Sequence, residues 1–334
     1  MANLGIIGST TWGTTLAIIN ASKDHKVTLF ARTKHESDEM VKFNSNPNRI
    51  PNHNFPESLN IDYIGGSGLY ESEILILAVP SESFRKNICA ISNNINKNAI
   101  IISASKGLEI QSGKRMSEII SDELPSINKN QICALSGPNL AGEILAGLPS
   151  SSVIACKNIK TAKYVQNILN SSLFRVYTND DLIGVEIAGA FKNVIAIAAG
   201  ISDGLKLGNN AKSAIITRGL AEMGRLGETL GARKSTFAGL SGMGDLIATC
   251  SSNMSRNYRA GEMIAQGQKT SNIIDTSKNV IEGIITTKSI MDISSSQNVE
   301  LPLAKSVFDV LFNDLSPLEG VKNLMKREQT SEIY

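Results

Sequence analysis

Residues 4–13 read LGIIGSTTWG, and this stretch predicts the fold of the first half of the chain. The apolar run 4–7 predicts a short β-strand, and the residues from Trp12 to position 21 predict a helix. Between them, Gly8 and Gly13 match the first and third glycines of a GxGxxG turn, which allow a tight bend and close packing of the helix on the sheet. The stretch predicts a dinucleotide-binding turn. The alternative is a strand-to-helix turn that binds no ligand.

Thr10 stands where the middle glycine of this motif belongs. A β-branched residue held in the left-handed backbone region would cost roughly 1–2 kcal/mol, equivalent to about tenfold in affinity. In the alternative arrangement, Thr10 has an ordinary φ and its hydroxyl bonds a phosphate oxygen of the ligand. Either way, the departure weakens the motif without excluding a nucleotide.

The second predicted strand, 27–30, bears on the choice of cofactor. A site that prefers NAD usually carries Asp or Glu at the end of this strand, where the carboxylate bonds the ribose 2′-hydroxyl. Here the strand runs into Ala31, Arg32, Thr33 and Lys34, with no carboxylate before Glu36. Arg32 could pair with a 2′-phosphate, so NADPH is favoured or at least admitted beside NADH. The alternative is that Arg32 and Lys34 belong to an ordinary solvated loop.

Short apolar runs alternate with helical patterns throughout the first half of the chain. These runs occupy 4–7, 27–30, 74–79, 99–104, 132–136, 153–156 and 173–177. Such alternation predicts an α/β fold, a Rossmann-like doubly wound parallel sheet with helices on both faces. Strand signals cease after Asn179. We therefore expect a dinucleotide-binding domain over 1–180 and an all-helical domain, which binds substrate and carries catalysis, over 181–334.

Charge and composition restrict the partners. The 334 residues include 33 basic and 31 acidic side chains, a net charge of +2, so no strong field would gather nucleic acid or a membrane surface. The partner is expected to be a small molecule. The start of the chain lacks the pattern of a secretory signal and no uninterrupted apolar run approaches membrane-spanning length, which favours a cytoplasmic protein without membrane insertion. The four cysteines are scattered without metal-ligand spacing and predict reduced core residues rather than a metal site.

Two loops are expected at the carboxyl ends of the strands, where open α/β sheets bind ligands. The run 99–104 leads into Ser105, Lys106 and Gly107, which places an ammonium there. The run 132–136 leads into the segment GPNLA at 137–141, where the free amides of a helix start could meet an anion. Each feature taken singly could be incidental.

The segment 182–201, LIGVEIAGAFKNVIAIAAGI, is apolar almost all round and predicts a buried helix. It nevertheless carries Lys192. A buried, unpaired ammonium is costly, so this lysine is expected to have a partner or a chemical role. The alternative is a structural ion pair with Glu186, although residues six apart face different sides of a helix.

Residues 239–263 read GLSGMGDLIATCSSNMSRNYRAGEM. The glycines before Asp245 predict a tight loop that presents a carboxylate. Ser255, Arg256 and Asn257 predict a helix start whose capping serine, free amides and arginine suit a phosphate. The alternative is a capped surface helix with a solvated arginine.

These segments taken together resemble the bacterial type of NAD(P)-dependent glycerol-3-phosphate dehydrogenase over nearly the whole chain. The matching segments are GSTTWGTTLA, ILAVPS, SASKGLE, SGPNLAGE, AGAFKNVIAIAAGISDGL, GLSGMGDLIATC, SRNYRAG and VIEG. The resemblance implies reduction of dihydroxyacetone phosphate to sn-glycerol 3-phosphate, a precursor of phospholipids. Asn139 departs from the family, which commonly has a small hydroxyl residue there.

The resemblance also implies roles for individual residues, with Lys192 as the catalytic lysine. The substrate contacts are expected to be Lys106, Gly137, Asn139, Lys192, Asp245, Ser255, Arg256 and Asn257. The cofactor contacts expected from the turn and the resemblance are Gly8, Thr10, Thr11, Trp12, Gly13, Arg32, Arg49, Lys106, Ala141, Arg256, Val280 and Glu282. No metal is expected.

Two other functions stay open on the residues alone. One is a different lysine-dependent reductase, acting on a hydroxy acid or a ketopantoate-like substrate. The other is a nucleotide sensor without catalysis, although a sensor would need none of Lys106, Lys192 and Asp245. A homodimer formed through the helical domain is also an expectation.

Overall fold

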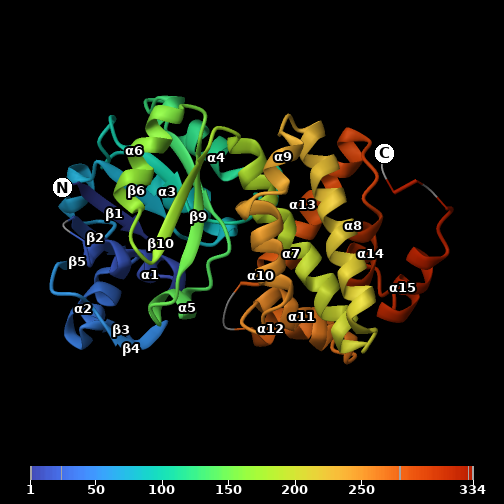
Figure 1. The fold of residues 1–334 in the computed structure, drawn as a ribbon. Coiled ribbons are helices and arrows are strands. Elements are labelled where there is room, and N and C mark those ends of the chain that lie inside the picture. Colours follow the sequence, from blue (N-terminus) through green and yellow to red (C-terminus); the bar gives the residue numbers. More distant parts are fainter. Residues whose placement is uncertain (1, 24, 278–279, 330, 333–334) are drawn as a thin grey trace.

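The computed structural model describes residues 2–23, 25–277, 280–329 and 331–332. The blue-to-green half of the chain forms a sheet with helices on both faces, and the yellow-to-red half forms a helical domain beside it (Figure 1). The last strand, β10, ends at Asn179 and the first helix of the second part begins at Leu182. A Rossmann-like sheet followed by an all-helical domain is therefore confirmed, and we keep 1–180 and 181–334 as the proposed domains.

The main sheet has eight strands in the order β10-β9-β8-β7-β6-β1-β2-β5. Its strands are β1 (Asn3–Ile7), β2 (Lys26–Ala31), β5 (Leu59–Tyr63), β6 (Ile74–Leu77), β7 (Ile100–Ser103), β8 (Ile132–Ser136), β9 (Ser150–Cys156) and β10 (Phe174–Asn179). From β5 to β8, neighbouring strands pair in parallel, and the spatial order reverses at β1. This reversal is the topological switch point at which doubly wound sheets bind their ligands.

The expectation of a wholly parallel sheet is wrong at one pair, because β9 runs antiparallel to β8. The connection between them contains only the short helix α5 (Ala141–Leu145). A parallel return requires a crossover that spans the sheet, usually with a full helix, and so short a connection instead turns the chain back beside β8. The final strand, β10, again pairs in parallel with β9.

Helices cover both faces of the sheet, and each face has its own apolar core. One core joins the sheet to α1 (Thr11–Ala21), α2 (Lys34–Phe43) and α6 (Ile159–Leu169). The other joins it to α3 (Phe84–Ile91) and α4 (Met116–Glu123). Three short 3-10 helices lie between these elements: η1 (Ser67–Glu71), η2 (Ser81–Ser83) and η3 (Lys129–Gln131). The packing on both sides fixes the strand ends that carry the site.

Three strands did not emerge from the sequence patterns. β5 is a partly exposed edge strand of five residues, LNIDY, and it lacks the apolar run of a central strand. The strands β3 (Ser45–Asn46) and β4 (Ile50–Asn54) form a separate antiparallel hairpin. Polar residues dominate this hairpin, and it places Arg49 in its turn.

The second half of the chain is helical and is built around α7 (Leu182–Gly204). The other elements are α8 (Gly208–Thr229), α9 (Lys234–Phe237), the π-helical turn η4 (Leu240–Gly244), α10 (Asp245–Cys250), α11 (Arg256–Ala265), α12 (Thr270–Thr276), α13 (Glu282–Gln297), α14 (Pro302–Phe312) and α15 (Pro317–Met325). The turn before Asp245 is thus helical rather than an open loop. Among the described helices, α7 alone is long and apolar enough to cross a membrane, and 89% of its most apolar window is buried inside the protein.

The cysteines follow the expected pattern except at one position. Cys133, Cys156 and Cys250 are buried, whereas Cys89 is exposed, which corrects the expectation of a core residue. Cys89 lies near the end of α3, and its thiol donates to Glu123 at 3.1 Å. The position is therefore part of a polar surface rather than of the core.

Candidate active site

A buried carboxylate joins the two lysines that the sequence singled out. Lys106 Nζ lies 2.6 Å from Oδ2 of Asp245, and Lys192 Nζ lies 2.5 Å from Oδ1 of the same carboxylate. The Asp245 side chain is 2% exposed and the Lys192 side chain 8%. Lys192 also donates to the hydroxyl of Thr249 at 2.7 Å. Two cations therefore share one anion in a largely dry site, where charge interactions are stronger than in water.

Each member of this cluster comes from a different part of the fold. Lys106 follows β7, Lys192 lies in the middle of α7, and Asp245 begins α10. Lys106 also donates to the carbonyl of Gly137, which follows β8, at 2.8 Å. The carboxyl ends of two neighbouring strands thus meet the helical domain at one point. Asp245 begins α10 directly after the π-helical turn η4, so the two helical elements together fix its position.

Burial and the neighbouring charges together set the charge state of Lys106. The pKa of Lys106 is lowered to about 8, chiefly by burial; Asp245 opposes this shift and the nearby ammonium of Lys192 adds to it. The Lys106 side chain is still 19% exposed, so it lines the site rather than the interior. An ammonium with this pKa changes charge within the range where enzymes work.

The alternative ion pair between Lys192 and Glu186 is wrong. Glu186 accepts from Arg115 Nη1 at 2.8 Å, and from the backbone and hydroxyl of Ser117 at 2.8 and 2.5 Å. Burial raises the pKa of Glu186, and Arg115 opposes this rise. Because Arg115 and Ser117 belong to the first domain and Glu186 to α7, this contact joins the domains and leaves Lys192 to Asp245.

The start of α11 lies beside the lysine helix. Ser255 caps this helix by accepting from Tyr258 N at 3.2 Å. The amide of Asn257 donates to Asn193 of α7 at 2.8 Å and accepts from Gly283 N at 2.9 Å. The predicted helix start is therefore present, and Asn193, the residue after Lys192, positions Asn257, the second residue of α11.

Arg256 stands at the same helix start and connects it to the beginning of α13. Its Nη1 donates to the carbonyl of Val280 at 2.8 Å. Burial lowers the pKa of Arg256; Glu282 opposes this shift, and Arg49 adds to it. The charge of Arg49, from the β3-β4 hairpin, therefore acts on Arg256 across the two domains. These cations could hold an anionic group between them.

Glu282 links the two domains directly. It accepts from the backbone N–H of Ser81 at 3.1 Å and from the Ser81 hydroxyl; Ser81 begins η2, which follows β6. Loss of solvent raises the pKa of Glu282, and the hydrogen bonds from Ser81 oppose this rise. Ser81 was not among the predicted residues, although it ends the segment ILAVPS.

The glycine turn has the geometry that the motif requires. Gly8 has a φ of +106°, and a Cβ there would lie 2.7 Å from Val79 Cγ1. A Cβ on Gly13 would lie 2.0 Å from the carbonyl oxygen of Gly8. Both positions therefore exclude a side chain, which leaves a tight cradle at the start of α1. Such a cradle, with free helix amides, suits a pyrophosphate.

Thr10 occupies an ordinary backbone region, with a φ of −69°. The possibility that it is held in left-handed backbone is therefore wrong. Its hydroxyl donates to the carbonyl of Ala78 at 2.7 Å and accepts from Gly13 N at 3.0 Å, so it caps α1. The single hydroxyl proton of Thr10 is thus already donated to the carbonyl of Ala78. A contact between Thr10 and the cofactor stays a prediction.

The remaining predicted residues lie at the starts of α1 and α5 or just after β2. Thr11 and Trp12 begin α1, and the ring of Trp12 lies 6.4 Å from that of Phe174. Arg32 is exposed at the end of β2, and Ala141 begins α5. Their contacts with a cofactor stay predictions.

Asn139 is already engaged within the first domain. Its Nδ2 donates to Ser150 Oγ and to the carbonyl of Ser151, both at 3.1 Å, and its Oδ1 accepts from Ser152 at 3.0 Å. The side chain thus ties the loop after β8 to β9. Both amide hydrogens have acceptors, so Asn139 Nδ2 can donate to the substrate only if one of its bonds opens, whereas Oδ1 can accept a second hydrogen bond.

Sequence reasoning gave no role in the site to Thr249, Asn193 or Asn46, although Asn193 stood out as a polar residue in the apolar segment 182–201. Thr249 follows Asp245 by four residues on α10, so helical spacing from the aspartate could have found it. Asn193 is adjacent to Lys192. Asn46 lies in an unpredicted strand and donates to the carbonyl of Ser9 at 2.9 Å, so no local signal pointed to it.

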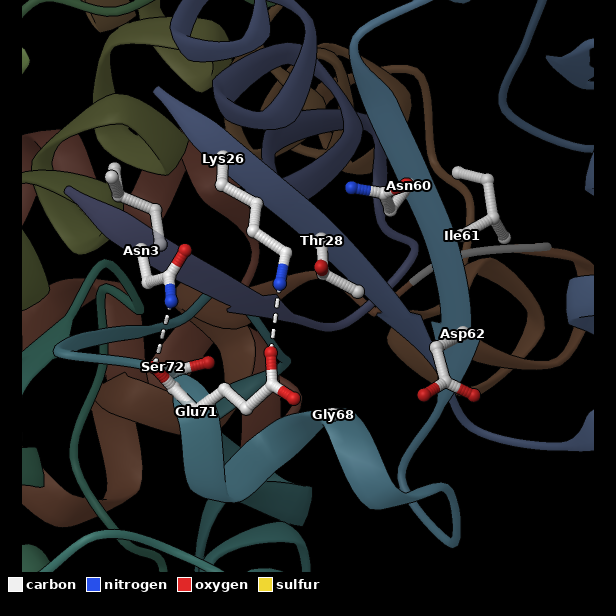
Figure 2. A pocket seen from close by; sticks show the side chains of 10 residues that line it. Asn3, Lys26, Thr28, Asn60, Ile61, Asp62, Gly68, Glu71 and Ser72 are labelled. Carbon is white, nitrogen blue, oxygen red and sulfur yellow. Dashed lines mark hydrogen bonds and ion pairs between the residues drawn. The ribbon is translucent and has the colours of Figure 1, made fainter. Parts of the chain in front are cut away.

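A cavity of about 240 Å³ lies away from these residues, between β2, β5 and η1. It is lined by Asn3, Leu4, Lys26, Thr28, Asn60, Ile61, Asp62, Gly68, Glu71 and Ser72. Figure 2 shows the Lys26–Glu71 ion pair among the residues that line it. Lys26 Nζ and Glu71 Oε2 lie 2.8 Å apart. No residue predicted for the site lines this cavity. Within the described part of the chain, no group of three or more His, Cys, Asp or Glu side chains could hold a metal ion.

The glycine cradle at the switch point of the sheet fits a dinucleotide, and Lys106, which shares Asp245 with Lys192, follows the strand β7 of the same sheet. Fold and site together define a two-domain dehydrogenase that uses a nicotinamide cofactor. Models of NAD-dependent glycerol-3-phosphate dehydrogenase match the chain with their N-terminal part over residues 3–162 and their C-terminal part over 181–322. The chain belongs to this family.

Individual relatives agree with this assignment. The chain is 44% identical over 334 residues to a glycerol-3-phosphate dehydrogenase [NAD(P)+] of Dehalococcoides mccartyi, covering all of this chain and 93% of the relative. It is 41% identical over 331 residues to one of Chlorobium phaeobacteroides, covering 99% of each chain. The solved glycerol-3-phosphate dehydrogenase of Coxiella burnetii has 37% identity and a TM-score of 0.92, covering 98% of this chain and 99% of that one.

The fold extends to more distant proteins. A ketopantoate reductase structure from Ralstonia eutropha has a TM-score of 0.57 at 12% identity, covering 96% of this chain and all of that one. This likeness concerns the fold alone. The comparisons therefore favour the phosphate-substrate dehydrogenases over the ketopantoate-like alternative.

Proposed function

We propose that this protein reduces dihydroxyacetone phosphate to sn-glycerol 3-phosphate with NADH or NADPH, reversibly, and so supplies glycerophospholipid synthesis. The observation that carries this proposal is the buried pair of lysines on one aspartate, within a chain that belongs to the glycerol-3-phosphate dehydrogenases. The bound reduced nicotinamide would supply the hydride for the ketone carbon.

Lys192 is the group best placed to manage the proton. Two of its ammonium hydrogens point to Asp245 and Thr249, which fixes the nitrogen and leaves the third for a substrate oxygen. In reduction, Lys192 stabilises the developing alkoxide and gives it a proton; in oxidation it accepts the alcohol proton. Asp245 orients the lysine and offsets its charge between turnovers.

Lys106 and the start of α11 would hold the rest of the substrate. Lys106 shares Asp245 with Lys192, so its ammonium lies beside the reacting oxygen and can order the hydroxyl end. The free amides after Ser255, with Arg256 and Asn257, provide donors for the phosphate. The cradle between Gly8 and Gly13 would hold the pyrophosphate of the cofactor.

One assay tests this function directly. Purified, folded protein is mixed with dihydroxyacetone phosphate and either NADH or NADPH, and the loss of reduced-nicotinamide absorbance is followed. We expect turnover with this substrate and none with ketopantoate. The absence of turnover with both cofactors would reject the proposal, and binding of cofactor without any turnover would favour a sensor.

We also propose that the protein works in the cytoplasm as a homodimer formed through the helical domain. Support for this surface comes from Met243 and Ile247, which are exposed apolar residues of η4 and α10. Light scattering should give twice the chain mass of 35.8 kDa. A monomer at micromolar concentration would reject the dimer.

A further inference from the structure

A carboxylate from α2 lies between the glycine turn and the end of β2. The residues that end β2 include no acid themselves. Glu36 belongs to the first turn of α2, yet its side chain points back toward the sheet. Its Oε1 accepts from the hydroxyl of Ser9, the second residue of the turn, and its Oε2 accepts from the backbone N–H of Arg32 at 3.2 Å. The carboxylate thus bridges the two segments that border the cofactor's adenosine in this fold.

The backbone around Glu36 holds the carboxylate in this place. Thr33 caps α2 by accepting from Glu36 N at 3.2 Å, which fixes the turn that carries the glutamate. Asn46 donates to the carbonyl of Ser9 and to the hydroxyl of Thr14, both at 2.9 Å. Both ends of the Ser9–Glu36 contact are therefore anchored, and the Glu36 carboxylate is only partly buried.

In doubly wound sheets, the acid that bonds the adenosine ribose ordinarily ends the second strand. Here β2 ends at Ala31, and Arg32 follows it. β1 and β2 pair in parallel with Ile7 opposite Phe30, so the turn after β1 and the residues after β2 leave the sheet side by side. A carboxylate anchored to both segments has the position of the missing acid, although it comes from the following helix.

We propose that Glu36 receives the ribose hydroxyls of NADH and discriminates against NADPH. A carboxylate accepts two hydroxyl hydrogens well, and it repels the 2′-phosphate that replaces one of them. Arg32 carries the opposite charge on the same segment and favours the 2′-phosphate. Glu36 and Arg32 therefore set the cofactor preference between them. This inference rests on the proposed function only in that a nicotinamide dinucleotide binds.

The experiment measures binding, not turnover. NADH and NADPH are each titrated into the wild-type protein and Glu36→Gln, and the change in nicotinamide fluorescence gives both dissociation constants. We expect NADH to bind about tenfold more weakly to the variant and NADPH to bind unchanged or more tightly, since loss of one charge-assisted contact is worth about that much. Asp38→Asn is the matched control, because Asp38 is an exposed acid on the same helix. Asp38→Asn should leave the ratio of the NADH and NADPH dissociation constants within about twofold of the wild-type ratio.

Two further variants make the result decisive. Arg32→Ala should weaken NADPH binding more than NADH binding, which is the opposite of the change expected for Glu36→Gln. If circular dichroism shows that Glu36→Gln is unfolded, Glu36→Asp is used, which keeps the charge on a side chain one methylene shorter; it should weaken NADH more than NADPH. An equal change for both cofactors in the glutamate variants, or no change, would overturn the inference. Since no turnover is needed, a shift in the ratio would support it even if the proposed reaction failed.

Discussion

Lys192 Nζ and Asp245 Oδ1 lie 2.5 Å apart, although 53 residues separate them in the chain. The second oxygen of the aspartate, Oδ2, accepts a hydrogen bond from Lys106, which belongs to the other domain. This one carboxylate thus assembles groups from both domains around the place where the substrate oxygen is expected. Removing any member should have a distinct effect.

Lys192→Ala should lower kcat by about 100-fold to 10,000-fold, the usual contribution of a positioned general acid. Binding of NADH should change little, because Lys192 bonds Asp245 and Thr249 rather than the glycine turn. Stopped-flow turnover and fluorescence titration measure the two quantities. Unchanged turnover would remove Lys192 from its proposed role.

Asp245→Asn should destabilise the protein, because it leaves two ammonium groups without their shared anion. Breaking a buried ion pair at one partner costs about 3–5 kcal/mol, and the partial exposure of Lys106 places the expected loss near the lower limit. Urea unfolding measures the change in the free energy of unfolding. Asp292→Asn, at an exposed position on α13, serves as the control and should change it by about 0.5 kcal/mol or less. Similar losses in both variants would contradict the shared-anion role.

The pH dependence of catalysis should reflect Lys106. Its pKa is lowered to about 8, so the side chain is charged below this pH and neutral above it. We therefore expect kcat/KM for dihydroxyacetone phosphate to fall as the pH rises through 8. Lys106→Arg keeps a cation at all these pH values and should remove the inflection. If the same inflection persists in the arginine variant, another group is responsible.

Glu222 should make stability depend on pH. Burial raises its pKa to about 7, although the backbone N–H groups of Leu303 and Ala304 donate to it and oppose the shift. The folded state therefore binds the Glu222 proton more tightly than the unfolded state does. The protonated Glu222 contributes fully to the free energy of unfolding below pH 4.5, and this contribution is lost as the pH rises to about 7. The loss is on the order of 3 kcal/mol.

Glu222→Gln should remove this part of the pH dependence, which thermal unfolding at several pH values between 4.5 and 7 can measure. Glu228→Gln, at an exposed position on the same helix, should leave it in place. If the unfolding temperature of the Glu222→Gln variant still decreases as the pH rises, as it does in the wild type, other groups cause the effect.

Thr10→Val should lower the free energy of unfolding by about 1–2 kcal/mol, because it removes a helix cap and leaves the carbonyl of Ala78 without its donor. Thr10→Ser retains the hydroxyl and should stay close to the wild type. Since the φ of Thr10 is −69°, Thr10→Gly relieves no strain and should not tighten NADH binding. Tighter binding by the glycine variant would mean that the threonine hinders the pyrophosphate.

Much of the fold could be predicted because its signals are local. The apolar runs of the central strands and the glycines of the turn mark the sheet, since a buried strand and a tight bend impose their demands on adjacent residues. The edge strand β5 and the reversal at β9 escaped prediction. An edge strand needs no continuous apolar run, and the direction of β9 depends on how the short connection packs.

By itself, the sequence determined the turn between Gly8 and Gly13, the buried helix around Lys192 and the two-part architecture, because periodicity and covalent neighbours express these features. Only the tertiary structure decided the partners: Asp245 for Lys192, Arg115 for Glu186, and Ser9 for Glu36. It also gave Thr10 its ordinary backbone and its role as a helix cap. The physical reason is that a hydrogen bond or ion pair between residues far apart in the chain depends on how the elements pack. Such a pair has no characteristic sequence separation by which it could be recognised.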